Sequence, residues 1–308
     1  MKKAVPIRYK KNVSLSNLNT FHLESIASRY IEIQNSKDLL TLLNSCLINH
    51  WTFRILAGGS NVVLPPEIRE DLLIHIKGNQ ISVENDYMSV ESGVLLANIV
   101  HVAIQNGWQG VEYLSGIPGT VGGAVVGNAG AYGRSISDVV DSVEIWDRGN
   151  VRVISKSDCM FSYRDSVFKK EPWIVLRINL KFGSGSRNKL KAVSEEITAQ
   201  RKNKYKDDLK CPGSFFKNIV IQTLNPIQLK AIDQAKIISG KLPVGYLLES
   251  VGAKGMRIGD IAVSDFHANL LINLGKGTYK DVSVLVDLLK QKVKKKFGIR
   301  LEEEIRYF

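Results

Sequence analysis

The chain has 308 residues, 44% of them hydrophobic and 23% charged, which is ordinary for a globular protein and long enough for two or three domains with filled cores. Its formal net charge of +12 favours anionic ligands: nucleic acid, an acidic membrane surface or phosphorylated small molecules. Nucleic acid is disfavoured because the basic residues are mostly scattered, and the densest runs, 8–11 and 292–296, have almost no aromatic residues among them.

Cysteine usage and hydropathy describe the expected compartment. Cys46, Cys159 and Cys211 are odd in number and far apart, which argues against a disulfide framework and fits a reducing compartment. The basic start MKKAVPIRYKKN has no apolar segment behind it, so no signal peptide is expected. No run approaches the roughly 18 apolar residues of a membrane span. We therefore expect a cytoplasmic protein without a membrane segment.

The first part of the chain predicts a strand, a helix and a second strand that ends in a small polar loop. Residues 29–33 alternate as a strand, residues 36–38 cap an amphipathic helix, and residues 51–56 form the second strand. The amides of the loop 57–61, AGGSN, can face a phosphate, although a hairpin turn is the simpler interpretation of the loop alone. Residues 62–64 resume as a strand, so this is neither a Walker nor a Rossmann turn.

Residues 72–81 and 87–94 predict two further strands, and residues 95–106 predict a helix that Gly107 ends. The stretch 115–138 then places seven glycines within 18 residues, at positions 116, 119, 122, 123, 127, 130 and 133. Glycine at this density carries a large entropic cost, and it suits a backbone that turns sharply and lies close to something bulky. A run of tight turns beside a buried helix explains the glycines equally well.

The middle of the chain predicts more sheet and then a change of composition. Residues 141–147 and 151–155 predict a hairpin, and residues 173–182 predict a long apolar strand. The segment 183–186, GSGS, is the best candidate for a linker between domains. A charged helix is expected over residues 189–205.

The last part predicts short strands followed by one long helix. GSFFKN at 213–218 enters a strand, and residues 267–274 form another. Thr278 caps a helix whose apolar residues recur every three or four positions, and Gly298 ends it. Residues 301–308 alternate as a final strand.

Six motifs follow one another in a fixed order: GGSN (58–61), GIPGTVGG with NAGAYG (116–133), YRDSVF (163–168), GSFFKN (213–218), KGMRIGDIAVSDFHANLLIN (254–273) and LEEEIR (301–306). This order resembles the family of UDP-N-acetylenolpyruvoylglucosamine reductases over nearly the whole chain, from about residue 20 onward. The short path from Arg164 to Trp173 points to the shorter, second type of that family.

The resemblance implies an α+β fold with a two-part FAD-binding domain of the vanillyl-alcohol-oxidase type, followed by an α/β substrate-binding domain. The implied domains are residues 1–75 and 76–186 for the two FAD-binding subdomains, and residues 187–308 for the substrate-binding domain. The C-terminal strand of that last domain is expected to return to the active site.

The activity implied by the resemblance is the NADPH-dependent reduction, through FAD, of an enolpyruvyl ether on a UDP-sugar to a lactyl ether. This step belongs to peptidoglycan precursor synthesis, and therefore to cell-wall biogenesis, cell shape and cell division. We expect a monomer that binds FAD, NADPH and a small-molecule substrate, with no nucleic acid, membrane or metal partner. FAD is expected to be non-covalent, because neither glycine-rich loop contains a histidine or a cysteine.

Two loops match the family's FAD contacts, and both could offer unobstructed amides to a pyrophosphate. The matching residues are Gly58, Gly59, Ser60, Asn61, Gly116, Ile117, Gly119, Thr120, Gly122, Gly123, Asn128, Ala129 and Gly130. For UDP and sugar the resemblance indicates Tyr163, Lys217, Asn218, Lys254 and Arg306.

Three residues match catalytic positions of the family: Ser214 as proton donor, Arg164 at the developing enolate, and Glu304 as the second acid of the terminal motif. A held hydroxyl can protonate a strongly basic carbanion, and a guanidinium offers two parallel donors to a carboxylate. Taken alone, these residues favour simpler interpretations: a serine bonding its own backbone, a surface ion pair and a charged terminal strand. Glu303 stands where the family has proline, so the choice between Glu302 and Glu304 as the acting acid stays open.

Two other functions are compatible with parts of the sequence. An FAD-linked oxidoreductase with a different substrate would use the same flavin fold, but it leaves GSFFKN and the terminal acid unexplained. A basic nucleotide- or RNA-binding protein without catalysis is disfavoured by the scattered charge and by the near absence of aromatic residues among the basic ones.

Overall fold

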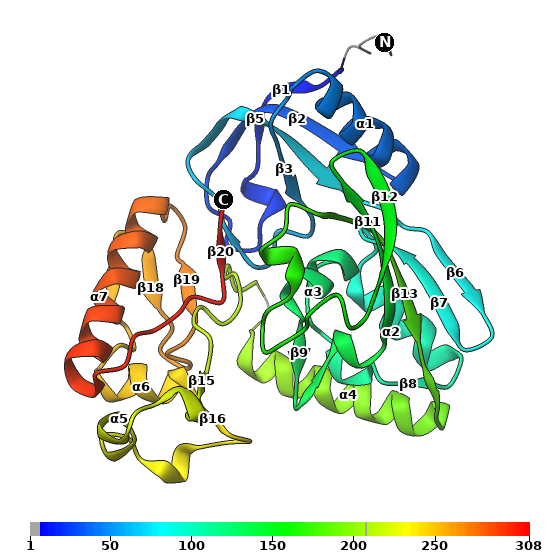
Figure 1. Ribbon diagram of the computed structural model, residues 1–308. Coiled ribbons are helices and arrows are strands. Elements are labelled where there is room, and N and C mark those ends of the chain that lie inside the picture. Colours follow the sequence, from blue (N-terminus) through cyan, green and yellow to red (C-terminus); the bar gives the residue numbers. More distant parts are fainter. Residues whose placement is uncertain (1–6, 207) are drawn as a thin grey trace. The chain divides into compact units, whose positions relative to one another are not determined.

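The structure is a computed structural model that describes residues 7–206 and 208–308. Residues 1–6, which begin the basic start discussed above, lie outside the described residues. The chain forms two compact units (Figure 1). The first contains the described part of residues 1–13, together with residues 27–58 and 68–203; the second contains residues 14–26, 59–67 and 204–308. The three-domain division at residues 75/76 and 186/187 stays a prediction.

A four-stranded sheet opens the first unit. Its order is β1 (Lys10–Ser14), β2 (Ile26–Ile33), β5 (Glu67–Ile76) and β3 (Phe53–Leu56). Strand β3 runs parallel to β5, with Leu56 opposite His75. Helix α1 (Ser36–Ile48) begins where the side chain of Asn35 accepts the amide of Asp38, and its buried leucines share a hydrophobic cluster with β5. Because β3 and β5 are parallel, their C-terminal ends lie on the same side of the sheet, and the loop at 58–61 begins on that side.

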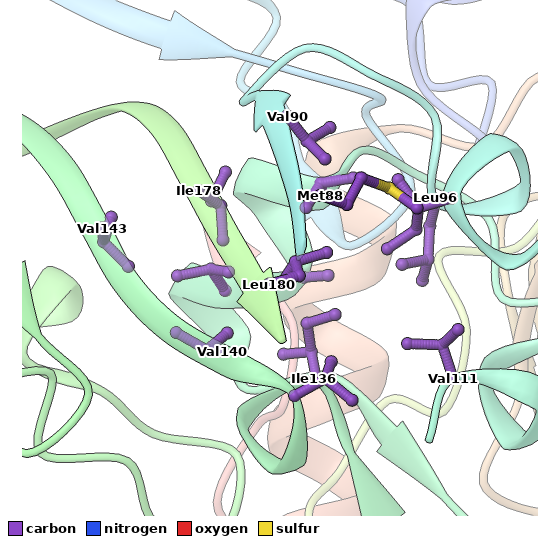
Figure 2. Close-up of a cluster of buried hydrophobic side chains, with 14 of the residues drawn as sticks. Met88, Val90, Leu96, Val111, Ile136, Val140, Val143, Ile178 and Leu180 are labelled. Atoms are coloured by element: carbon purple, nitrogen blue, oxygen red, sulfur yellow. The ribbon is translucent and has the colours of Figure 1, made fainter. Parts of the chain in front are cut away.

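A five-stranded antiparallel sheet forms the larger part of the first unit. Its order is β12 (Asn150–Ser155), β11 (Val140–Asp147), β13 (Ile174–Lys181), β7 (Tyr87–Glu91) and β6 (Ile81–Glu84). Helices α2 (Leu96–Gln105) and α3 (Val121–Gly127) share its hydrophobic core. Figure 2 shows Met88, Ile178 and Leu180 of this sheet in one cluster with Leu96 of α2.

The predicted linker at 183–186 is wrong. Gly183 and Ser184 form strand β14 (Gly183–Ser184), which pairs antiparallel with β8 (Trp108–Gln109). The rings of Trp108 and Phe182 stack with their centroids 5.2 Å apart, which holds the segment that enters β14 in place. The chain then continues into the charged helix α4 (Arg187–Lys204), which was expected at 189–205. A second small pair, β9 (Gly130–Ala131) and β10 (Arg134–Ser135), lies within the glycine-rich stretch.

The second unit is built around one hydrophobic cluster under the long helix α7 (Tyr279–Phe297). Its sheets are β17 (Arg257–Ile258), β18 (Ile261–Val263) and β19 (Leu271–Asn273), then β15 (Ile219–Val220) with β16 (Lys241–Leu242), and β4 (Val62–Val63) with β20 (Arg306–Tyr307). Helices α5 (Pro226–Lys230) and α6 (Val244–Ser250) complete it. Within the described residues, no helix is long and apolar enough to cross a membrane.

The final strand predicted over 301–308 is shorter in the structure. Only Arg306 and Tyr307 form a strand, β20, which runs parallel to β4. The residues before it make a single bridge between Glu303 and Phe216, so the segment follows the GSFFKN motif without forming a continuous ladder. Leu301 and Ile305 are nevertheless buried, as the alternation predicts.

Candidate functional site

The loop that follows β3 lies against other backbone at both of its glycines. A Cβ on Gly58 would lie 2.7 Å from the Cα of Gly119. Gly59 has a φ of +60°, and a Cβ there would lie 2.0 Å from the carbonyl oxygen of Leu18. The amide of Thr20 donates to the carbonyl oxygen of Gly59 at 3.1 Å. Both glycines are therefore required by close approach of the backbone.

The end of the same loop is connected to the C-terminal segment. The side-chain amide of Asn61 donates to the carbonyl oxygen of Glu304 at 3.1 Å, and the amide of Arg306 donates to the carbonyl oxygen of Asn61 at the same distance. Ser60 is half-buried between Gly59 and Asn61. Asn61 thus has a structural partner of its own, in the segment that contains the predicted acid.

The glycine-rich stretch contains a short helix, α3, with well-defined ends. The hydroxyl of Thr120 accepts the amide of Gly123 at 3.2 Å and caps the N-terminus. Asn128 ends the helix in the left-handed conformation, with a φ of 42°. Its side-chain amide donates to the carbonyl oxygen of Ser162 at 2.8 Å, so the end of α3 is tied to the turn that contains Arg164.

Several glycines of this stretch are required by the fold itself. Gly116 and Gly119 have φ values of 71° and 112°, a region that favours glycine. A Cβ on Gly122 would lie 2.7 Å from a neighbouring side chain, and one on Gly130 would lie 2.3 Å from a backbone oxygen. At these four positions, tight turns and close packing account for the glycines, the alternative that sequence alone left open.

Gly123 and Gly127 have a different environment. A Cβ on Gly127 would meet nothing within 4 Å, and one on Gly123 would meet only the hydroxyl of Thr120, at 3.5 Å. Gly123 is also exposed, so nothing described in the fold requires a glycine there. A flat helix face of this kind suits a ligand that must approach the backbone.

The residues of both loops fit a flavin nucleotide. The buried hydroxyl oxygen of Thr20, next to the 58–61 loop, has no hydrogen-bond partner among the described residues, which is unusual for a buried polar atom. The side chains of Ile117 and Ala129 are half-buried and pack against the core of the first unit. Among the described residues there is no group of three or more histidine, cysteine, aspartate or glutamate side chains that could hold a metal ion.

Arg164 lies at the tip of a tight turn. The backbones of Ser162 and Asp165 exchange two hydrogen bonds, of 3.0 and 3.2 Å, and Tyr163 and Arg164 form the tip between them. Arg164 has a φ of 56°, and its guanidinium donates to the carbonyl oxygen of Gly130 at 2.6 Å. Its guanidinium carbon lies 5.4 Å from the centroid of the Tyr163 ring. The arginine is therefore tied to the glycine-rich stretch.

Ser214 lies between two polar side chains. Its hydroxyl oxygen is 3.3 Å from the Nζ of Lys204 and 3.3 Å from the hydroxyl of Tyr205. The alternative from sequence, a serine that only bonds its own backbone, does not describe this geometry. A cation beside the hydroxyl favours its deprotonated form, and a second hydroxyl can replace its proton.

The strand segment after Ser214 is held by Asn269. The side chain of Asn269 accepts the amide of Phe216 and donates to its carbonyl oxygen, both at 2.9 Å. His267 accepts the amide of Asn269 at 3.2 Å through Nδ1. Burial, and then the positive charge of Lys204, lower the pKa of His267 to about 4, so its imidazole is neutral at neutral pH. His267 and Asn269 together therefore fix the position of the GSFFKN segment.

The three terminal glutamates have different partners. Glu302 forms an ion pair with Lys217, whereas Glu303 pairs with Lys290 of α7 at 2.5 Å. The amide of Glu304 donates to the carbonyl oxygen of Phe215 at 2.9 Å, which places Glu304 beside the residue that follows Ser214. The amide of Lys217 donates to the carbonyl oxygen of Glu302, also at 2.9 Å, so both candidate acids pair with the GSFFKN segment, and Glu304 is the one opposite the neighbour of Ser214.

The other predicted substrate residues are spread over the second unit. Asn218 accepts the amide of Val244 at the start of α6, at 3.2 Å. Lys254 pairs with Glu249 of α6 at 2.8 Å, and Arg306 lies in β20. Tyr163 and Arg164, by contrast, belong to the first compact unit, whereas Ser214 and Glu304 belong to the second.

Sequence reasoning missed Lys204 and Tyr205. The pattern at 189–205 predicts a charged, solvated helix, and Lys204 is one of many basic residues in it. The only available signal was that this helix precedes GSFFKN by a short loop, and the position of Ser214 against its end depends on tertiary folding.

Comparisons with known proteins identify the family to which these motifs belong. A family described as "FAD binding domain" matches residues 27–155, and one described as "UDP-N-acetylenolpyruvoylglucosamine reductase, C-terminal domain" matches residues 203–308. The chain is similar to UDP-N-acetylenolpyruvoylglucosamine reductases of Solibacter usitatus (34% identity, 95% of this chain and 94% of the relative) and Clostridium novyi (31%, 96% and 91%).

Among solved structures, the chain is similar to UDP-N-acetylenolpyruvylglucosamine reductase from Thermus caldophilus. The two share 27% sequence identity with a TM-score of 0.77, over 98% of this chain and 99% of the other. These matches confirm the expected α+β fold, with an FAD-binding domain followed by the C-terminal domain of the reductase family.

Proposed function

The chain belongs to the UDP-N-acetylenolpyruvoylglucosamine reductase family and is an FAD-dependent oxidoreductase, and from this we propose that it reduces UDP-N-acetylglucosamine enolpyruvate to UDP-N-acetylmuramate with NADPH. The observation that supports this function best is the position of Ser214, whose hydroxyl lies 3.3 Å from both Lys204 and Tyr205. The proposed setting is peptidoglycan precursor synthesis in the cytoplasm, by a monomer.

FAD, when bound, supplies the transfer of hydride from NADPH to the vinyl carbon of the substrate. The proposed FAD contacts are the loop 58–61 and the exposed face of α3, where Gly123 and Gly127 leave the backbone open. The buried hydroxyl of Thr20 beside the first loop offers one further hydrogen bond.

Ser214 is the proposed proton donor to the carbon that bears the ether oxygen. The hydroxyl is a weak acid, so it needs groups that stabilise the alkoxide it leaves behind. The ammonium group of Lys204 provides positive charge at hydrogen-bond distance, and the hydroxyl of Tyr205 can donate a proton back. The two hydrogen bonds between the side chain of Asn269 and the backbone of Phe216 hold the segment after Ser214 in place during the proton transfer.

Arg164 is proposed to stabilise the negative charge that develops on the substrate carboxylate, because a guanidinium stays charged and binds a carboxylate with parallel hydrogen bonds. Glu304 is the proposed acid of the terminal motif, since its backbone pairs with Phe215. Lys217 and Lys254 are proposed to bind the phosphates. Each forms an ion pair with a glutamate here, so phosphate would replace a carboxylate partner.

The test is a visible spectrum of the purified protein, followed by NADPH with and without the enolpyruvyl UDP-sugar. We expect a yellow protein whose flavin is bleached by NADPH and regains its colour when the substrate is added. Flavin that is reduced but not reoxidised by this substrate would identify an FAD-linked oxidoreductase with another substrate. A colourless protein that cannot be reconstituted with FAD would contradict the proposal.

A further inference from the structure

The backbone of Arg164 has a conformation that its residue type disfavours. Tyr163 and Arg164 form the tip of a turn closed by hydrogen bonds between Ser162 and Asp165, and Arg164 has a φ of 56°. A positive φ at the third residue of such a turn normally selects glycine or asparagine, because a Cβ is strained there. Turn preference alone would therefore not place an arginine at this position. Neighbouring groups must hold it.

Lys169 contacts the strained residue directly. It lies at the end of the 3-10 helix Val167–Lys169, and its Nζ donates to the carbonyl oxygen of Arg164 at 2.5 Å. A charge-assisted hydrogen bond of this kind is roughly twice as strong as a neutral one. The peptide plane after Arg164 is thereby fixed, while the guanidinium at the other end of the residue bonds Gly130 at 2.6 Å.

The neighbouring lysine makes a different contact with the same turn. Lys170 pairs with the carboxylate of Asp165 at 3.1 Å, and its side chain is 65% exposed. An exposed ion pair of this type contributes little. Lys170 is therefore a matched control: it is also a lysine bound to the Ser162–Asp165 turn, but its ion pair is with Asp165 and not with the backbone of Arg164.

We propose that Lys169 is a positioning residue for Arg164, holding the left-handed backbone that aims the guanidinium. This rests on the proposed function, in which Arg164 stabilises charge on the substrate. Loss of the Lys169 contact should let the turn relax, and misplacement of a catalytic group by about 1 Å can reduce a rate by roughly a hundredfold. The effect should appear in kcat for substrate reduction, because the step that reduces the flavin does not use Arg164.

The experiment measures two rates for each variant: turnover with NADPH and the enolpyruvyl UDP-sugar, and flavin reduction by NADPH with ferricyanide as acceptor. Lys169→Met should lower the first about ten- to a hundredfold and leave the second unchanged. Lys169→Arg should restore most of the loss, and Lys170→Met should stay within about twofold of the unchanged protein.

A double-mutant cycle separates positioning from general damage. Lys169→Met should have no further effect in an Arg164→Ala background. Equal losses in both backgrounds would overturn the inference while leaving the proposed function intact. Unchanged turnover in Arg164→Ala alone would reject both the role of Arg164 and the inference. If Lys169→Met does not retain FAD, Lys169→Gln, which keeps a neutral donor, takes its place in the same cycle with the same criteria.

Discussion

Adding one methyl group at Gly123 should separate the needs of the cofactor from the needs of the fold. A Cβ there would lie 3.5 Å from the hydroxyl of Thr120, an ordinary contact, so Gly123→Ala introduces no strain in α3. Alanine is favoured over glycine inside a helix by about 0.5–1 kcal/mol, so the FAD-free protein should be slightly more stable. If FAD lies on this face, the methyl group overpacks the contact and costs about 1–3 kcal/mol, or roughly five- to 150-fold in affinity.

Gly58→Ala is the opposite case. Its Cβ would lie 2.7 Å from the Cα of Gly119, and backbone cannot move aside as the end of a long side chain can. The FAD-free protein should lose about 1–3 kcal/mol of stability.

The assay combines thermal melts of both variants without FAD and a titration with FAD followed by flavin fluorescence. An unchanged FAD affinity in Gly123→Ala would refute the proposal that FAD contacts the exposed face of α3. An unchanged melting temperature in Gly58→Ala would refute the close approach of the two loops.

Three further predictions concern the second unit. Ser214→Ala should leave flavin reduction by NADPH unchanged and lower turnover by about 10²–10⁴, and unchanged steady-state turnover would reject the proton donor. Lys204→Met should lower turnover and Tyr205→Phe should lower it less, each without slowing flavin reduction in stopped-flow traces; a slowed reduction would place these residues in the NADPH step instead. The pKa of His267 is lowered from 6.5 to about 4, so between these values the unfolded chain binds a proton that the folded chain does not. Stability should be full above pH 6.5 and fall by about 3 kcal/mol toward pH 4, and melts of His267→Gln over this range should lose that part of the pH dependence.

Helix α7 illustrates what the sequence predicted well. The cap at Thr278, the apolar residues at spacings of three and four, and the end at Gly298 all follow from local rules and all occur in the structure, which adds the side chain of Asp281 to the cap. The order of the motifs likewise predicted the family. The features of α7 depend on neighbours within one or two helical turns, so no tertiary information is needed to predict them.

The glycine-rich stretch shows what sequence could not separate. Close packing of backbone and close approach of a ligand both select glycine, so the composition of the stretch cannot distinguish them. The structure shows which of these glycines the fold itself requires: a Cβ on Gly122 or Gly130 would clash with neighbouring atoms, whereas one on Gly123 would make only an ordinary contact and one on Gly127 would meet nothing within 4 Å. The prediction of a linker at 183–186 was wrong for a related reason. GSGS has the composition of a linker, and only the pairing with β8 shows that Gly183 and Ser184 form a strand.

The terminal run of three glutamates required tertiary contacts in the same way. Glu302 and Glu303 each pair with a lysine, Lys217 and Lys290, and Glu303 also forms the bridge with Phe216. A proline at position 303 could form no ion pair with α7, so the glutamate adds a contact between the terminal segment and that helix. This contact holds the register in which the amide of Glu304 meets the carbonyl oxygen of Phe215. The same register pairs the carbonyl oxygen of Glu302 with the amide of Lys217 at 2.9 Å, so the departure from the family pattern stabilises the segment without deciding between Glu302 and Glu304 as the acid.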